Sequence, residues 1–194
     1  MDDKEIIYDH YKDTVSIIKN EEGKRNKYFI IILLHILILF LISINETSVY
    51  SIIKGIIKEN FNVDICFGIN VIQLIIMFSM LYLTIRYFQV NIHIDRLYKY
   101  LHNVEQELSD KVSKSISREG KSYLNNYPKT LNVIYFCYKY IFPLVYIIAL
   151  VVRFFINDTW DNWIVKLIEF LLTIMIIILN VFYIMDSYNL DNKN

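Results

Sequence analysis

Four long apolar stretches, separated by charged segments, constrain the fold of this chain more than any other feature. They cover residues 28–44, 65–85, 133–155 and 163–185. A helix that crosses a bilayer needs about 20 mostly apolar residues, because the hydrocarbon core is about 30 Å thick. Each stretch approaches or reaches this length, the first only just. The sequence therefore predicts an all-α integral membrane protein with four transmembrane helices.

The composition agrees with long helices and excludes little else. The 194 residues include only 4 Gly and 2 Pro, which are the residues that most disfavour a helix interior. The formal net charge is zero, so charge gives no reason to expect direct binding of nucleic acid. Ile and Asn are very common, as an AT-rich bacterial or phage-associated gene would produce. We therefore expect a protein of the bacterial inner (plasma) membrane.

The distribution of basic residues predicts the orientation of the chain. Of the 20 Lys and Arg residues, 15 lie in the two terminal segments and the segment between the second and third stretches, and Lys139 lies just inside the third stretch at that side. Only Lys54, Lys58, Arg153 and Lys166 lie in the two remaining gaps or at the stretch ends beside them. Since Lys and Arg are enriched in cytoplasmic loops, both termini and this middle segment are predicted to be cytoplasmic. The polar first 27 residues do not resemble a secretory signal, so we expect the first stretch to be an uncleaved signal anchor.

These features divide the chain into five parts. Residues 1–27 form a cytoplasmic amphipathic helix with a basic anchor, and 28–88 form the first transmembrane hairpin. Residues 89–132 form a cytoplasmic helical stalk and a return linker. The second transmembrane hairpin covers 133–186, and 187–194 form a cytoplasmic tail.

Two further amphipathic helices are predicted outside the apolar stretches. The first covers residues 3–20 and ends near Gly23; its apolar face carries Ile7, Tyr11, Val15 and Ile18. The second lies in the outer loop of the first hairpin. It either rests on the outer membrane surface or covers the helix bundle, and its apolar residues are Val49, Ile52, Ile53, Ile56 and Ile57.

The stalk shows a heptad-like pattern. Its apolar residues recur in steps of three and four, and no breaker separates them from the second stretch, so one helix should continue to about residue 118 and end at Gly120. An apolar seam must be buried, either against the N-terminal helix of the same chain or against the stalks of neighbouring chains. We expect a homo-oligomer. The seam residues are Ile94, Leu97, Leu101, Val104 and Leu108.

Polar residues inside the apolar stretches form stripes. Such groups usually face a bundle interior or an aqueous cavity, so the stripes either hydrogen-bond between helices or line an ion path. Glu169 is the strongest candidate, with Lys166 as its expected partner, although Lys139, Arg153 and Lys166 lie near stretch ends and can snorkel to the interface. The stripe residues are His35; Asn70, Gln73, Met77, Met80 and Thr84; Lys139, Pro143, Tyr146 and Arg153; and Lys166, Glu169, Thr173 and Asn180.

A basic patch lies near the far end of the stalk and contains Lys111, Lys114, Arg118 and Lys121. It is either a solvated helix face or a contact for a soluble acidic partner, an anionic lipid or a nucleotide.

Enzyme chemistry is not expected. None of the four His residues forms a metal-binding pair at i,i+4, and the sequence lacks HExxH, GxSxG and P-loop motifs. We therefore predict no catalytic residue, no metal and no cofactor. A membrane scaffold or sensor with a soluble cytoplasmic partner is the favoured function, and a gated channel or membrane-permeabilising effector is the alternative.

The layout of the whole chain resembles the small four-span membrane subunits of bacterial antiphage defence systems. The resemblance rests on the predicted orientation, the stalk over residues 94–116 and the Ile/Asn-rich, Gly-poor composition. It covers the chain from residue 3 to residue 186. Two kinds are similar: the membrane subunit of Kiwa-type systems, a tetramer that holds a cytoplasmic DNA-binding partner, and four-span effectors that work with second-messenger synthases. The resemblance implies oligomerisation and either partner docking or membrane disruption in antiviral defence, and it assigns no functional residue.

Overall fold

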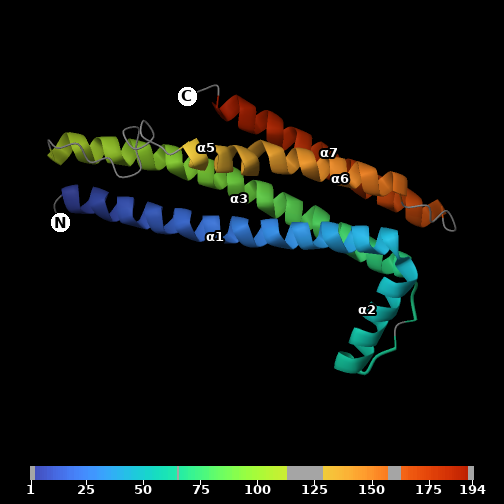
Figure 1. Ribbon diagram of the computed structural model, residues 1–194. Coiled ribbons are helices and arrows are strands. Elements are labelled where there is room, and N and C mark those ends of the chain that lie inside the picture. The colour runs from blue at the N-terminus through green and yellow to red at the C-terminus, as the bar shows by residue number, and fades with distance from the viewer. Residues whose placement is uncertain (1–2, 65, 113–128, 157–162, 192–194) are drawn as a thin grey trace. The chain divides into compact units, whose positions relative to one another are not determined.

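The computed structural model describes residues 3–64, 66–112, 129–156 and 163–191, and every regular element within these ranges is helical (Figure 1). The all-α prediction is therefore confirmed for the described part of the chain. The elements are α1 (Asp3–Ile44), α2 (Glu46–Phe61), α3 (Ile69–Val112), α5 (Lys129–Phe136), a π-helical turn (Cys137–Ile141), α6 (Phe142–Ile156) and α7 (Trp163–Asp191).

Four helical segments of the described ranges are long and apolar enough to cross a membrane. They are Glu5–Ile44, Ile69–Val112, Val133–Ile156 and Trp163–Asn189. Each contains one of the four apolar stretches or most of it. α5 begins at Lys129, inside the predicted return linker, and α7 continues to Asp191, into the predicted tail.

The chain divides into two compact units. Met1–Tyr28 and Arg86–Lys139 form one, here called the amphipathic unit, and Phe29–Ile85 and Tyr140–Asn194 form the other, here called the apolar unit. Both α1 and α3 contribute one part of their length to each unit. The polar segments at these helix ends therefore form a folded unit of their own.

The prediction that Gly23 ends the N-terminal helix is wrong. α1 continues through Gly23 and the basic cluster that follows, without interruption, from Asp3 to Ile44. Gly costs about 1 kcal/mol relative to Ala inside a helix, which is too little to break a helix that neighbouring residues support. One such support is the Glu21–Lys24 ion pair, with 2.7 Å between Oε1 and Nζ.

The predicted continuity of the second apolar stretch with the stalk is confirmed as far as Val112, because α3 runs unbroken from Ile69 to Val112. The expected end of the stalk near residue 118 and its stop at Gly120 lie outside the described residues.

The stalk seam forms the core of the amphipathic unit. Leu101 and Val104 of α3 are buried against Tyr11 and Ile18 of α1, and the seam residue Leu97 packs against this cluster. The remaining seam residues, Ile94 and Leu108, are buried as well. Of the two coverings that the sequence left open, the structure shows the one within the same chain. The homo-oligomer stays a prediction, and this seam is not an exposed surface for it.

The apolar unit has polar groups inside and apolar groups outside. α6 and α7 lie side by side and antiparallel in it (Figure 1). Its buried polar side chains are Gln73, Thr84, Arg153, Glu169, Thr173, Asn180 and Ser187. Its surface carries large apolar side chains that include Leu37, Ile75, Leu144, Ile148, Leu171 and Phe182. Buried polar groups and a broad apolar surface are unusual for a protein surrounded by water and are typical of helices surrounded by lipid.

Candidate functional site

The most strongly charged buried site of the apolar unit is an ion pair between α6 and α7. Arg153 lies in the last turn of α6 and Glu169 in the second turn of α7, and their side chains meet through Nη1 and Oε1. The Arg153 side chain is 3% exposed and the Glu169 side chain 5%. The same Nη1 lies 3.6 Å from Sδ of Met77, so α3 also contacts the pair. Three helices therefore converge on one pair of opposite charges.

Arg153 keeps hydrogen-bonding capacity beyond this pair. Its Nε and Nη2 are buried and have no hydrogen-bond partner among the described residues. A guanidinium has five N–H donors, and buried donors are normally bonded to protein or to ordered water. The guanidinium therefore retains N–H donors beyond those that it directs at Glu169 and Met77.

The structure shows a partner of Glu169, Arg153, that the sequence analysis does not assign. The sequence allows Arg153 and Lys139 to snorkel to the interface. Both side chains are almost fully buried in ion pairs, so snorkelling does not hold for either residue. Lys166 is half-buried, with Nζ 5.9 Å from the centroid of the Phe154 ring, and its pairing with Glu169 stays a prediction.

A second polar contact links α3 and α6 deeper in the apolar unit. The hydroxyl of Thr84 donates to the carbonyl of Met80 at 2.7 Å and lies 3.0 Å from the hydroxyl of Tyr146. Because the single hydroxyl proton of Thr84 is used in the first bond, Tyr146 is the donor in the second. Both side chains are buried, and this bond joins two of the predicted stripes.

The remaining stripe residues of α7 bond mainly to their own helix. Thr173 Oγ1 donates to the carbonyl of Glu169, and Asn180 Nδ2 donates to the carbonyl of Ile176, both at 2.8 Å. Asn180 is fully buried, and its Oδ1 has no partner among the described residues. On α3, Gln73 is buried and Asn70 half-buried, and Oδ1 of Asn70 likewise lacks a partner in the described ranges. The polar stripes thus face the interior of the apolar unit.

His35 connects α1 to α3 within the apolar unit. Its Nδ1 lies 2.8 Å from the carbonyl of Ile31, and its Nε2 lies 3.0 Å from the hydroxyl of Ser79. In a neutral imidazole Nδ1 is then the donor, which makes Nε2 the acceptor for the Ser79 hydroxyl. Sequence reasoning singled out His35 but missed Ser79, although Ser79 is one of the few hydroxyl residues in the second apolar stretch.

Lys139 belongs to the amphipathic unit. Its side chain is 4% exposed, its Nζ lies 3.5 Å from Oδ2 of Asp95 on α3, and it donates to the hydroxyl of Tyr135 at 2.5 Å. The π-helical turn Cys137–Ile141 holds it there. Pro143 explains the turn, since it has no N–H for the carbonyl of residue 139 and its ring crowds that carbonyl. Lys139 therefore ties α3 to the segment that leads into α6.

The basic patch is only partly described. Lys111 is exposed, and its Nζ lies 3.5 Å from Oε1 of Glu107, one turn earlier on α3. Lys114, Arg118 and Lys121 lie outside the described residues. The patch as a whole stays a prediction.

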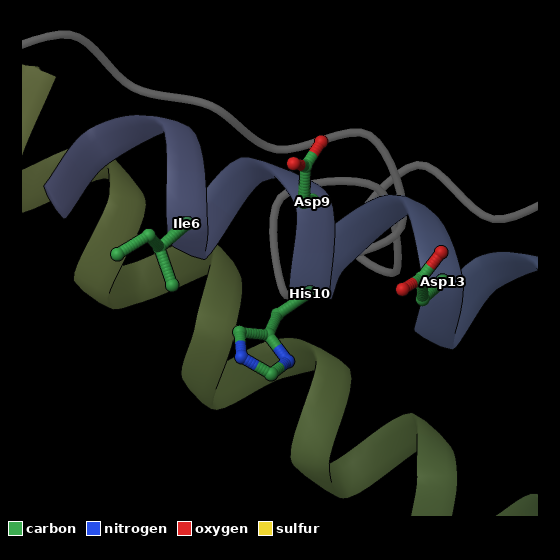
Figure 2. A pocket seen from close by; sticks show the side chains of 4 residues that line it. All are labelled: Ile6, Asp9, His10 and Asp13. Atoms are coloured by element: carbon green, nitrogen blue, oxygen red, sulfur yellow. The ribbon is translucent and has the colours of Figure 1, made fainter. Parts of the chain in front are cut away.

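A shallow depression on α1, in the amphipathic unit, is lined by Ile6, Asp9, His10 and Asp13 (Figure 2). Asp9 and His10 point away from each other in Figure 2, so these side chains do not converge on one ion. Within the described ranges, no group of three or more His, Cys, Asp or Glu side chains could hold a metal ion.

No family model, curated protein or solved structure matches this chain. The resemblance to antiphage membrane subunits therefore stays an expectation from the layout of the sequence.

Proposed function

We propose that this protein spans the bacterial inner membrane four times, with both termini in the cytoplasm, and that its amphipathic unit is a platform for a soluble partner. In line with the resemblance in layout, we propose that the complex serves antiphage defence and that the chain acts as a homo-oligomer. The observation that carries the proposal is the separate core of the amphipathic unit. Helices that only cross a membrane would not need one.

The amphipathic unit leaves apolar side chains beside its core exposed, which supports the proposal of a binding partner. In the described ranges the N-terminal part of α1 covers one side of the α3 seam, and apolar side chains beside it remain exposed. Ile6 is 41% exposed, Ile17 46% and Tyr100 48%. Exposed apolar groups of this kind, interspersed with charges, are typical of interaction surfaces.

Site-specific photo-crosslinking in living cells tests the platform. A benzophenone side chain replaces Tyr100 in the amphipathic unit or, as the matched control, Val145 on the apolar surface. We expect the benzophenone at position 100 to crosslink one soluble protein reproducibly. The benzophenone at position 145 should crosslink lipid or this chain itself. Reversing Lys111, Lys114 and Arg118 to Glu should abolish that crosslink while leaving membrane insertion intact. Equal labelling of the same protein from both positions would contradict the platform.

Oligomeric state and defence need their own measurements. The lipid-corrected mass of the purified protein in nanodiscs should be a discrete multiple of 23.3 kDa, as for a tetramer. The mass of a monomer would refute the proposed homo-oligomer. Phage plaque counts should fall when the gene and its neighbours are expressed and should recover when the Tyr100 crosslinking partner is deleted.

The second candidate function is a gated channel or a membrane-permeabilising effector. The specific observation in its favour is the buried Arg153–Glu169 pair, in which Nε and Nη2 of Arg153 have no hydrogen-bond partner within the described ranges. If the polar stripes line an ion path, Glu169→Gln and Asn180→Leu should each change ion flux through liposomes that contain the protein. Unchanged flux in both variants would assign the stripes to helix packing.

A further inference from the structure

α2 (Glu46–Phe61) is an amphipathic helix that the rest of the apolar unit leaves uncovered. A single residue, Asn45, separates it from the end of α1, and α3 begins at Ile69. None of its residues is buried. In Figure 1, α2 turns sharply away from the direction of α1. Its place in the chain therefore puts it beside the ends of two apolar helices of the same unit.

The two faces of α2 differ strongly. Isoleucines recur at helical spacing on one face, and Lys54 and Lys58 lie on the opposite face together with Thr and Ser. Ile53 and Ile57 are half-buried, whereas Ile52 is 60% exposed and Ile56 is 53% exposed. The outermost part of the apolar face is thus open to its surroundings.

Local contacts hold this helix in a defined form. The Asn45 side chain accepts a hydrogen bond from the N–H of Ser48 at 3.1 Å, as an N-cap does. At the other end Asn62 adopts a left-handed conformation with φ 53°, which Asn tolerates better than most residues. The Tyr50 hydroxyl donates to the carbonyl of Phe67 at 2.7 Å, which ties the segment after α2 back to the helix.

The charges of α2 cancel. It contains Glu46, Lys54, Lys58 and Glu59, and Lys58 also pairs with Asp64 at 3.0 Å. The rest of its polar face consists of Thr, Ser and Gly. Attraction to anionic headgroups needs an excess of basic residues, which α2 lacks. Only the apolar face can then drive its association with a membrane.

We infer that α2 inserts its open apolar face into the outer leaflet, and that its depth follows the packing of the lipids rather than the charge of their headgroups. The inference rests on the proposed four-span topology. The continuity of the apolar surface identifies lipid as the occupant: Ile44, the last residue of α1, is 78% exposed, and Val71 and Ile75 at the start of α3 are also exposed. α2 continues this surface at its edge.

Spin-label accessibility of the full-length protein in liposomes tests the inference. Cys66 and Cys137, the free cysteines of the described ranges, are first changed to Ser. Single labels are then placed at Ile56 on the apolar face, at Lys54 on the polar face, and at Leu37 in the apolar part of α1. Collision with oxygen reports contact with lipid tails, and collision with a nickel chelate reports contact with water.

In dioleoyl phosphatidylcholine, the label at Ile56 should favour oxygen and the label at Lys54 should favour the nickel chelate. Equal access of both labels to nickel, with Leu37 still protected, overturns the inference and leaves the proposed topology intact. Protection of Ile56 from both reagents also overturns it, because a second copy or another protein would then cover the face. Access of nickel to Leu37 would instead refute the four-span proposal.

Lipid composition tests the second half of the inference. Adding dioleoyl phosphatidylglycerol, which is anionic, should leave the ratio of oxygen to nickel collisions at Ile56 unchanged. Replacing the lipid by palmitoyl-oleoyl phosphatidylcholine with cholesterol, which packs more tightly, should lower that ratio several-fold while Leu37 stays constant. The opposite pattern, a response to anionic lipid and none to packing, would overturn the assignment.

Discussion

Removal of one charge from the Arg153–Glu169 pair should destabilise the apolar unit more than any other single polar change in the described helices. Glu169→Gln leaves the guanidinium of Arg153, whose side chain is 3% exposed, without a counter-charge. Breaking a buried ion pair in this way costs about 3–5 kcal/mol, compared with about 0.6 kcal/mol for an ordinary interhelical hydrogen bond in a membrane. The unfolding equilibrium constant should therefore rise roughly 10²- to 10⁴-fold.

Reversible unfolding in mixed micelles with increasing SDS, followed by circular dichroism, measures this effect. The double variant Arg153→Met with Glu169→Leu should recover stability to within about 1–2 kcal/mol of the unmodified protein, since apolar residues of similar volume replace the whole pair. Thr173→Val is the matched control, because its hydroxyl donates only to the carbonyl of Glu169 on its own helix, and it should cost less than about 1 kcal/mol. A cost below 1 kcal/mol for Glu169→Gln, or additive costs in the double variant, would refute the picture of a dry, coupled pair.

Three further predictions address other parts of the chain. Leu101→Ala removes a fully buried side chain from the core of the amphipathic unit, so it should cost about 2–5 kcal/mol and speed amide exchange of α1, while the exposed Tyr100→Ala changes exchange little. His35→Ala removes the bond to Ser79 and should cost about 0.6 kcal/mol or more in SDS unfolding, whereas Ser79→Ala removes the same bond, leaves His35 on the carbonyl of Ile31, and should cost no more than about 0.6 kcal/mol. Asn45→Ala removes the N-cap of α2, costs about 1 kcal/mol locally and should speed amide exchange of its first turn while α7 exchanges as before.

The helices could be predicted from the sequence because their signals are local. Apolar length and helical spacing determine the four long apolar helices, the stalk seam and α2, and the structure contains helices at each of these places. Glycine and proline both disfavour the interior of a helix, but Gly23 and Pro143 have different effects in this chain. α1 continues through Gly23 without interruption. Pro143, in contrast, closely follows a π-helical turn, Cys137–Ile141. Gly or Pro inside a helix only adds a free-energy cost. Whether the helix continues, distorts or ends there depends on how strongly the neighbouring residues stabilise it.

Charge partners were harder to predict because they depend on tertiary register. Helical spacing suggests Lys166 as a partner of Glu169, but spacing along one helix gives no sign of Arg153, which lies on another helix. The short connection between the third and fourth stretches held the better signal, since residues at equal distances from its centre face each other across an antiparallel hairpin. With the connection centred between residues 159 and 160, that rule places Glu169 opposite Leu150, one helical turn from Arg153, the partner that the structure shows. No such rule was at hand for Lys139 and Asp95, because a linker outside the described residues separates their helices.

The hydrogen bonds of the polar stripes favour packing over conduction. A group that lines an aqueous path is expected to keep its donors and acceptors free for water and ions, but Thr84, Thr173 and Asn180 each donate to a carbonyl of their own helix. In the described ranges, the buried polar atoms of this unit that lack partners are confined to Asn70, Arg153 and Asn180. A continuous water path would have to join them, and Met80 and Ile176, both fully buried, lie along the same helix faces. Ion flux that depends on Glu169 would show that these apolar positions can open. If ion flux does not depend on Glu169, the role of the Arg153–Glu169 pair is to fix how α3, α6 and α7 pack against each other, which a rigid platform requires.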